Sequence, residues 1–221
     1  MKIRDLCHMY SLPHPLTLLQ EQPDKEVFKS QVKLSVQEYW QKALVQEAES
    51  LHSLTYFKPN FMSLSKPHPL WTTCGSNPYE VNKACIQAKY LSGRFRTDTL
   101  LHHFNKANPK FCQLHPDDPE VGDLVHLLVH CPVLAERRAA IFDYWDTLAA
   151  DSPPCLEILQ LAKSGPTTTF MQFILDCSVM PQVILAKQIH GESIHNILFK
   201  ASRTYCYSIY RERLKRLDQW C

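Results

Sequence analysis

Residues 24–50 read DKEVFKSQVKLSVQEYWQKALVQEAES, and this stretch sets the expectation for the rest of the chain. Apolar side chains recur in it at spacings of three and four, the period of an amphipathic helix; they are Val27, Phe28, Val32, Leu34, Val36, Tyr39, Trp40, Ala43, Leu44 and Ala48. Asp24 stands before the first of them, where a carboxylate can cap a helix N-terminus. The stretch therefore predicts one long amphipathic helix that begins near Asp24.

The remaining sequence carries the same period in shorter pieces. Gly occurs 5 times and Pro 15 times, a combination that disfavours hairpin-rich β folds and suits helices with abrupt ends. Asn77 and Pro78 fit the first positions of a helix that ends at Gly93. We expect further helices at 99–105, 122–130, 133–150, 154–163, 167–177, 181–190 and 192–217. The predicted fold is mainly α, with helical bundle-like lobes and a small Cys/His zinc-knuckle insertion.

Three regions follow from this pattern. We expect an N-terminal helical segment with an irregular, proline-containing connector at 1–76, a region that carries the Cys/His insertion at 77–150, and C-terminal helices at 151–221. Apolar residues make up 45% and charged residues 21% of the 221 residues, which are ordinary globular values and argue against disorder.

The cysteines and the apolar segments indicate where in the cell the protein is expected. The nine cysteines are odd in number and scattered, with no signal peptide before them, so we expect reduced thiols inside the cell, in the nucleus or the cytoplasm. The most apolar stretch, 166–186, contains Asp176 and Pro181 and predicts no membrane span. The formal net charge is only +2, so any basic surface has to be local.

One group of residues has the spacing of a metal site. Two residues separate Cys112 from His115, and four separate His126 from Cys131. Thiolates and imidazoles in two close pairs suit tetrahedral zinc. On a continuous helix, positions five apart differ by roughly 140°, so the helix has to end between His126 and Cys131, and Pro132 favours that ending.

Two other interpretations of these residues stay open. His126 and His130 lie at positions i and i+4 of one helical face and could share an ion without any break in the helix. Alternatively, the histidines are ordinary, partly buried side chains and Cys131 is a core thiol.

Cations surround the Cys/His group in the sequence. They are Lys89, Arg94, Arg96, Lys106 and Lys110 before it and Arg137 and Arg138 after it. Such cations could engage the phosphates of RNA or single-stranded DNA, and the interleaved Tyr90 and Phe95 could stack on bases. The alternative is a solvated helix rim with Phe95 in the core.

The last predicted helix shows a similar ambiguity. Lys200, Arg203, Tyr207 and Arg211 line up on one side of it. They form either a binding strip or a solvated face, while the apolar opposite side packs on the protein.

Three stretches together resemble a known family. LSGRFRTDTLLHH (91–103), FCQLH (111–115) and GDLVHLLVHCPVLAERR (122–138) are similar to the C-terminal segment of non-LTR (LINE-type) retrotransposon reverse transcriptases. That segment carries a Cys-x2-Cys…His-x4-Cys knuckle downstream of the polymerase domain. The resemblance places Cys112, His126 and Cys131 on three ligand positions and His115 where the family has a cysteine.

The resemblance implies a non-catalytic fragment that binds RNA or DNA through a zinc knuckle and its basic flanks, with the polymerase portion of the same element as a partner. The palm motif of the polymerase, an aromatic-x-Asp-Asp, is absent: HPDD (115–118) lacks the aromatic residue. We therefore expect no enzymatic activity. The alternative is a degenerate remnant that serves as a structural or protein-interaction domain without metal or nucleic acid.

Overall fold

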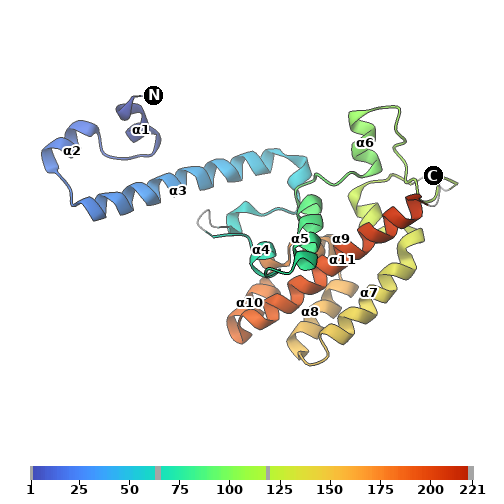
Figure 1. Cartoon of the computed structure of the whole chain (residues 1–221). Helices are drawn as coiled ribbons and strands as arrows, with labels where there is room; N and C mark the ends of the chain where they lie inside the picture. The colour runs from blue at the N-terminus through green and yellow to red at the C-terminus, as the bar shows by residue number, and fades with distance from the viewer. Residues whose placement is uncertain (1, 63–65, 118–119, 219–221) are drawn as a thin grey trace. The chain divides into compact units, whose positions relative to one another are not determined.

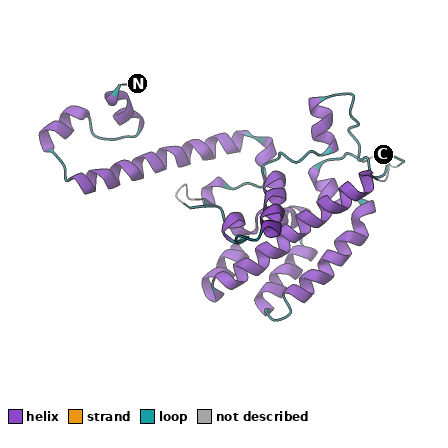
Figure 2. Cartoon of the chain, viewed as in Figure 1, coloured by secondary structure: helices purple, strands orange, loops and turns teal. Residues whose placement is uncertain are grey.

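The computed structural model describes residues 2–62, 66–117 and 120–218. Their regular structure is helical (Figure 2), and within them only an isolated antiparallel bridge joins Phe111 to Val121. Asp118, the last residue of the HPDD run, lies outside the described residues. The mainly α fold predicted from the sequence is confirmed.

The chain divides into two compact units. The N-terminal unit comprises Met1–His52 and Lys58–Pro67, and the C-terminal unit comprises Ser53–Phe57 and His68–Cys221. The two regions expected at 77–150 and 151–221 both belong to the C-terminal unit.

The N-terminal unit is built around one long helix. Its elements are α1 (Ile3–Met9), α2 (Pro15–Glu21), α3 (Lys25–Ser50) and a short 3₁₀ turn at Pro59–Phe61. A second 3₁₀ turn, His52–Leu54, begins in this unit and continues into the C-terminal unit. The Asp24 carboxylate accepts hydrogen bonds from the backbone N–H groups of Glu26 and Val27, both at 3.0 Å. These bonds satisfy donors that have no partner within the helix. The predicted start of this helix is therefore confirmed.

The C-terminal unit is a helical bundle in which the last helix runs across several of the others (Figure 1). Its elements are α4 (Pro69–Thr72), α5 (Pro78–Leu91), α6 (Asp98–Phe104), a π-helical turn (His126–His130), a 3₁₀ turn (Pro132–Leu134), α7 (Ala135–Leu148), α8 (Pro153–Ser164), α9 (Thr167–Asp176), a 3₁₀ turn (Cys177–Val179), α10 (Pro181–His190) and α11 (Glu192–Asp218). Helix α11 packs against α5, α7, α8, α9 and α10. Trp145, Phe173 and Tyr205 are fully buried between these helices.

Local sequence explains where α5 begins and ends. The side chain of Asn77 accepts a hydrogen bond from the backbone N–H of Tyr79 at 2.9 Å, and Pro78 occupies the first turn. Gly93 follows the helix with φ of 64°, a left-handed conformation that side chains disfavour. An added Cβ there would also lie 2.5 Å from the Cβ of Ser53. Both predicted ends of the helix are confirmed.

Both interpretations of the last helix, a binding strip and a solvated face, require four exposed side chains, and this expectation is wrong for two of them. Arg203 and Tyr207 are buried. The guanidinium of Arg203 lies 2.9 Å from the Glu80 carboxylate and donates hydrogen bonds to the hydroxyl and carbonyl oxygens of Thr73. Because α11 packs against several other helices, Arg203 is paired inside the bundle, whereas Lys200 and Arg211 face solvent.

The segment Thr167–His190 is long and apolar enough, by length and composition, to cross a membrane. It comprises α9, the intervening 3₁₀ turn and α10. Within it, Met171, Phe173, Ile174 and Leu175 are fully buried in the C-terminal unit. These side chains form part of the helical core.

Candidate metal centre

Backbone pairing shapes the first half of the Cys/His group. The backbone N–H of Cys112 donates to the carbonyl oxygen of Glu120 at 2.8 Å, and that of Gly122 donates to the carbonyl oxygen of Lys110 at 3.1 Å. These bonds bring together the ends of the segment that carries Cys112 and His115. A loop that is tied at its base holds its side chains in a restricted region.

The second half is a single wide turn of helix. The backbone N–H of Cys131 donates to the carbonyl oxygen of His126 at 2.7 Å, an i to i+5 bond that closes the π-helical turn. Such turns are rare and often occur at functional sites. The wider turn brings positions five apart to the same side, which a regular α-helix does not do. The chain leaves the helix at Cys131, just before Pro132, as the sequence predicted.

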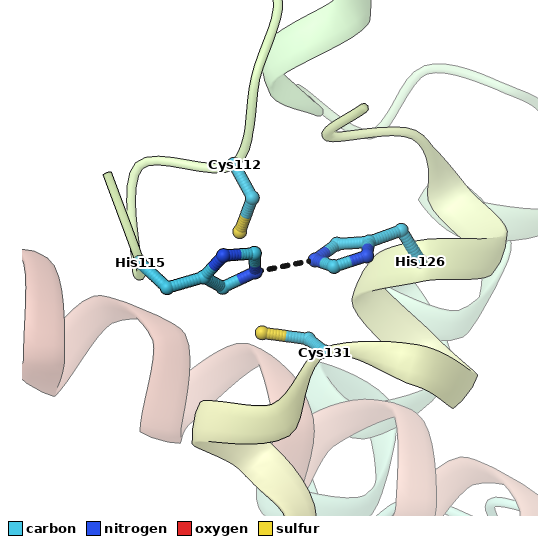
Figure 3. A group of neighbouring side chains, drawn as sticks. All are labelled: Cys112, His115, His126 and Cys131. Atoms are coloured by element: carbon cyan, nitrogen blue, oxygen red, sulfur yellow. Dashed lines mark hydrogen bonds between the residues drawn. The ribbon is translucent and has the colours of Figure 1, made fainter. Parts of the chain in front are cut away.

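Four side chains converge between these two segments (Figure 3). One ligand atom from each of Cys112, His115, His126 and Cys131 lies within 4.8 Å of the other three. The Nε2 atoms of the two histidines are 2.9 Å apart. Both cysteines and His126 are buried, and His115 is half-buried. This cluster could hold a metal ion.

Carboxylates orient His126 from outside the cluster. Its Nδ1 lies 2.8 Å from a Glu120 carboxylate oxygen, and its backbone N–H donates to Asp123 at 2.7 Å. When Nδ1 donates to a carboxylate, the imidazole presents Nε2 as its free donor atom, an arrangement common around protein-bound metals. Nothing in the spacing of the motif identified Glu120, because its role depends on the folded loop.

A hydrogen bond joins the two thiols. The Cys112 thiol donates a hydrogen bond to the Cys131 sulfur, which lowers the pKa of Cys131 to about 7. The same bond, together with burial, raises the pKa of Cys112. The positive charge of Arg138 also favours the Cys131 thiolate. The pair therefore releases its first proton easily, and the thiolate is the form of cysteine that binds metals.

A buried carboxylate, that of Asp98, joins the loop that carries Cys112 and His115 to helix α11. Asp98 is 3% exposed, and one of its oxygens lies 2.9 Å from the Arg213 guanidinium of α11. The same oxygen accepts a hydrogen bond from the Gln113 side chain at 3.0 Å. Asp98 also lies close to Gly122, because a Cβ atom added to Gly122 would be 2.7 Å from the Cβ atom of Asp98. Sequence reasoning missed this residue, since its partners are far away along the chain.

The structure does not bring His126 and His130 together as a pair of ligands. His130 is exposed, and it is not among the four described side chains whose ligand atoms converge. The π-helical turn separates the two histidines, which an α-helical turn would have placed on one face.

The predicted cations are on the surface, whereas the predicted aromatic partners are not. Five of them, Lys89, Arg94, Arg96, Lys106 and Lys110, are exposed and form no ion pair with the described residues. Arg137 is exposed, with its guanidinium 3.4 Å from the Ser208 hydroxyl, and Arg138 is half-buried.

Tyr90 and Phe95 cannot stack on bases, which corrects the interpretation that they belong to a binding surface. Both are buried, and their rings stack on each other with centroids 4.0 Å apart. The exposed aromatic residues of this region are Phe104 and Phe111, with exposed fractions of 77% and 47%. They flank Lys106 and Lys110 in the sequence.

The comparisons with known proteins add no relative. No protein-family model, no curated protein and no solved structure matches the chain significantly. The resemblance to the reverse-transcriptase segment therefore rests on the quoted sequence motifs alone.

Proposed function

We propose that Cys112, His115, His126 and Cys131 bind one Zn²⁺ ion as a structural site. The observation that carries this proposal is the convergence of two thiols and two imidazoles within 4.8 Å. Tetrahedral zinc requires such sulfur and nitrogen atoms to lie roughly 3.3 to 3.8 Å apart. The widest separations in the cluster would therefore contract on binding, and the two histidine Nε2 atoms, now 2.9 Å apart, would move slightly apart. Four protein ligands leave no open position for a substrate, and this is the mark of a structural site.

The function that we infer for the module is non-catalytic binding of single-stranded nucleic acid. The site joins the loop around Cys112 to the turn before α7, and the exposed cations flank both of these segments. Unpaired lysines and arginines are free to neutralise phosphates, and the exposed Phe104 and Phe111 can stack on bases. This function agrees with the resemblance to a non-catalytic segment of a larger retrotransposon enzyme, whose polymerase portion would be a partner.

We also propose a reducing, intracellular compartment for the protein. All eight cysteines within the described part of the chain are free thiols. Zinc thiolates and free cysteines are both compatible with the nucleus or the cytoplasm.

Metal content is the direct test of the site. Purified protein is expected to contain close to one equivalent of zinc, and its removal by a chelator is expected to lower the unfolding temperature because metal binding is coupled to folding. Elemental analysis and thermal unfolding measure both quantities. Less than about a tenth of an equivalent, together with no effect of chelation, would contradict the proposal and favour the metal-free packing role.

Replacing Glu120 with glutamine is expected to weaken zinc binding by about 10- to 100-fold, since carboxylates that orient a ligand histidine typically contribute that much. Glu120 is half exposed, so the protein should remain folded. Competition with a chromophoric chelator measures the affinity. Glu136→Gln, a matched change at an exposed glutamate of α7, should bind zinc like the wild type.

The Arg94→Ala/Arg96→Ala variant is expected to bind single-stranded RNA with a shallower dependence on salt. Each lost phosphate contact should reduce the slope of log affinity against log salt by about 0.7. Fluorescence anisotropy at several salt concentrations measures the slope. Lys42→Ala/Lys200→Ala removes two exposed cations elsewhere and should leave the slope unchanged. An equal change in both variants would show that the effect comes from overall charge.

A further inference from the structure

Helix α3 carries an apolar groove that its own unit leaves uncovered. The groove is lined by Lys29, Val32, Lys33, Val36, Gln37, Trp40, Ala43, Leu44 and Glu47. Trp40 in its middle is 51% exposed. The 3₁₀ turn at Pro59–Phe61 contacts a different side of the helix, where the Gln41 side chain donates to the carbonyl oxygen of Pro59 at 2.7 Å.

The N-terminal unit has little core of its own to stabilise this helix. Among its described residues, the buried apolar side chains are Cys7, Ala48 and Pro59. A helix in water gains most of its stability from the tertiary packing of its apolar side chains. The groove of α3 therefore needs a partner from outside the unit.

The charges along the groove are arranged so that two antiparallel copies of the helix would bring opposite charges together. Lys29 and Lys33 lie toward its N-terminal end, and Glu47 lies at its C-terminal end. Lys29 and Glu47 are equally far from residue 38, as are Val32 and Leu44. The two charged positions are about 27 Å apart along the helix. Lys29 also lies 3.7 Å from Glu26 of the same helix. This ion pair is exposed to solvent, so it competes only weakly with a second partner for Lys29.

We propose that α3 pairs antiparallel with α3 of a second copy of this chain, in a two-fold symmetric homodimer. Trp40 then packs near Val36 of the partner subunit, and Lys29 faces Glu47 of the partner subunit at each end. A symmetric interface contains every contact twice, so each favourable pair counts double. A parallel arrangement is disfavoured because it would place lysines against lysines and Glu47 against its own copy. This proposal is independent of zinc and of nucleic acid.

A charge-exchange experiment on the full chain tests the pairing. Lys29→Glu and Glu47→Lys each place like charges at both ends of the dimer, so each variant alone should dimerise about tenfold or more weakly than the wild type. An equimolar mixture of the two variants restores both opposite-charge pairs and should form a heterodimer with nearly wild-type affinity. Analytical ultracentrifugation measures all of these equilibria.

Two further variants serve as controls. Lys42→Glu makes the same charge change on α3 outside the groove and should leave dimerisation unchanged. Trp40→Ala removes the central aromatic residue from both copies and should weaken the dimer by about 100-fold or more. A wild-type chain that stays monomeric at about 100 μM would overturn the proposal. So would a dimer that is insensitive to Lys29→Glu and Glu47→Lys, because its interface would lie elsewhere.

Discussion

The Cys131→Ser variant is expected to lose zinc and, with it, the ordered structure of the surrounding segment. Cys131 is fully buried and provides one of the four converging ligand atoms. Serine is a poor zinc ligand at this position. Replacing a residue that only orients a ligand typically weakens metal binding by about 10- to 100-fold, and the loss for Cys131→Ser should be larger. Because binding energy is also folding energy, hydrogen-exchange protection should fall across 106–117 and 120–135.

His130→Ala is the matched control for this experiment. His130 neighbours Cys131 in sequence but is exposed and lies outside the cluster. The variant should retain zinc, and its protection should match that of the wild type. A greater loss for His130→Ala than for Cys131→Ser would favour His126 and His130 as the ligands. Chelation should lower the unfolding temperature of the control and leave that of Cys131→Ser unchanged.

Replacing Asp98 with alanine is expected to destabilise the C-terminal unit by about 3–5 kcal/mol, because it leaves the buried Arg213 guanidinium without its counter-charge. The variant also removes the acceptor for the Gln113 side chain, next to Cys112. Zinc affinity should therefore fall although no ligand has changed. Urea unfolding and chelator competition measure the two effects.

Two comparisons separate the buried pair from a general loss of charge. In Asp98→Ala/Arg213→Met the unpaired cation is gone, so stability should recover part of the loss. Glu212→Ala breaks the pair of Glu212 with Arg216, an i, i+4 contact of the same helix that is less buried than the pair of Asp98 with Arg213. That change should cost less than about 1 kcal/mol. If Asp98→Ala cost no more than Glu212→Ala, the buried pair would not anchor the loop.

Features that depend on neighbouring residues in the sequence could be predicted. The capping carboxylate of Asp24, the asparagine and proline that begin α5, and the left-handed Gly93 all act within a few residues. The spacing of the Cys/His group likewise identified the four side chains that the structure brings together.

Features that depend on distant residues could not be predicted. Arg203 is separated from its partner Glu80 by 123 positions, and Arg213 from Asp98 by 115. Helical periodicity places such arginines on a polar face, although that face is covered by other helices in the fold. The π-helical turn was missed for another reason: its hydrogen bond differs from that of an α-helix by a single residue, and no side-chain pattern distinguishes them.

The central position of α11 has a consequence for how the protein is made. This helix follows in sequence all five helices that pack against it. Ribosomes add about 5–20 residues per second, so the earlier helices wait for at least a second or so with their inner faces exposed while α11 is synthesised. The Cys/His segments, by contrast, span 20 positions and can meet as soon as they leave the ribosome. During translation, the Cys/His site can therefore form early, whereas the bundle can be completed only after α11 is made. Nascent chains that end before α11 expose the inner faces of the earlier helices and are expected to bind chaperones.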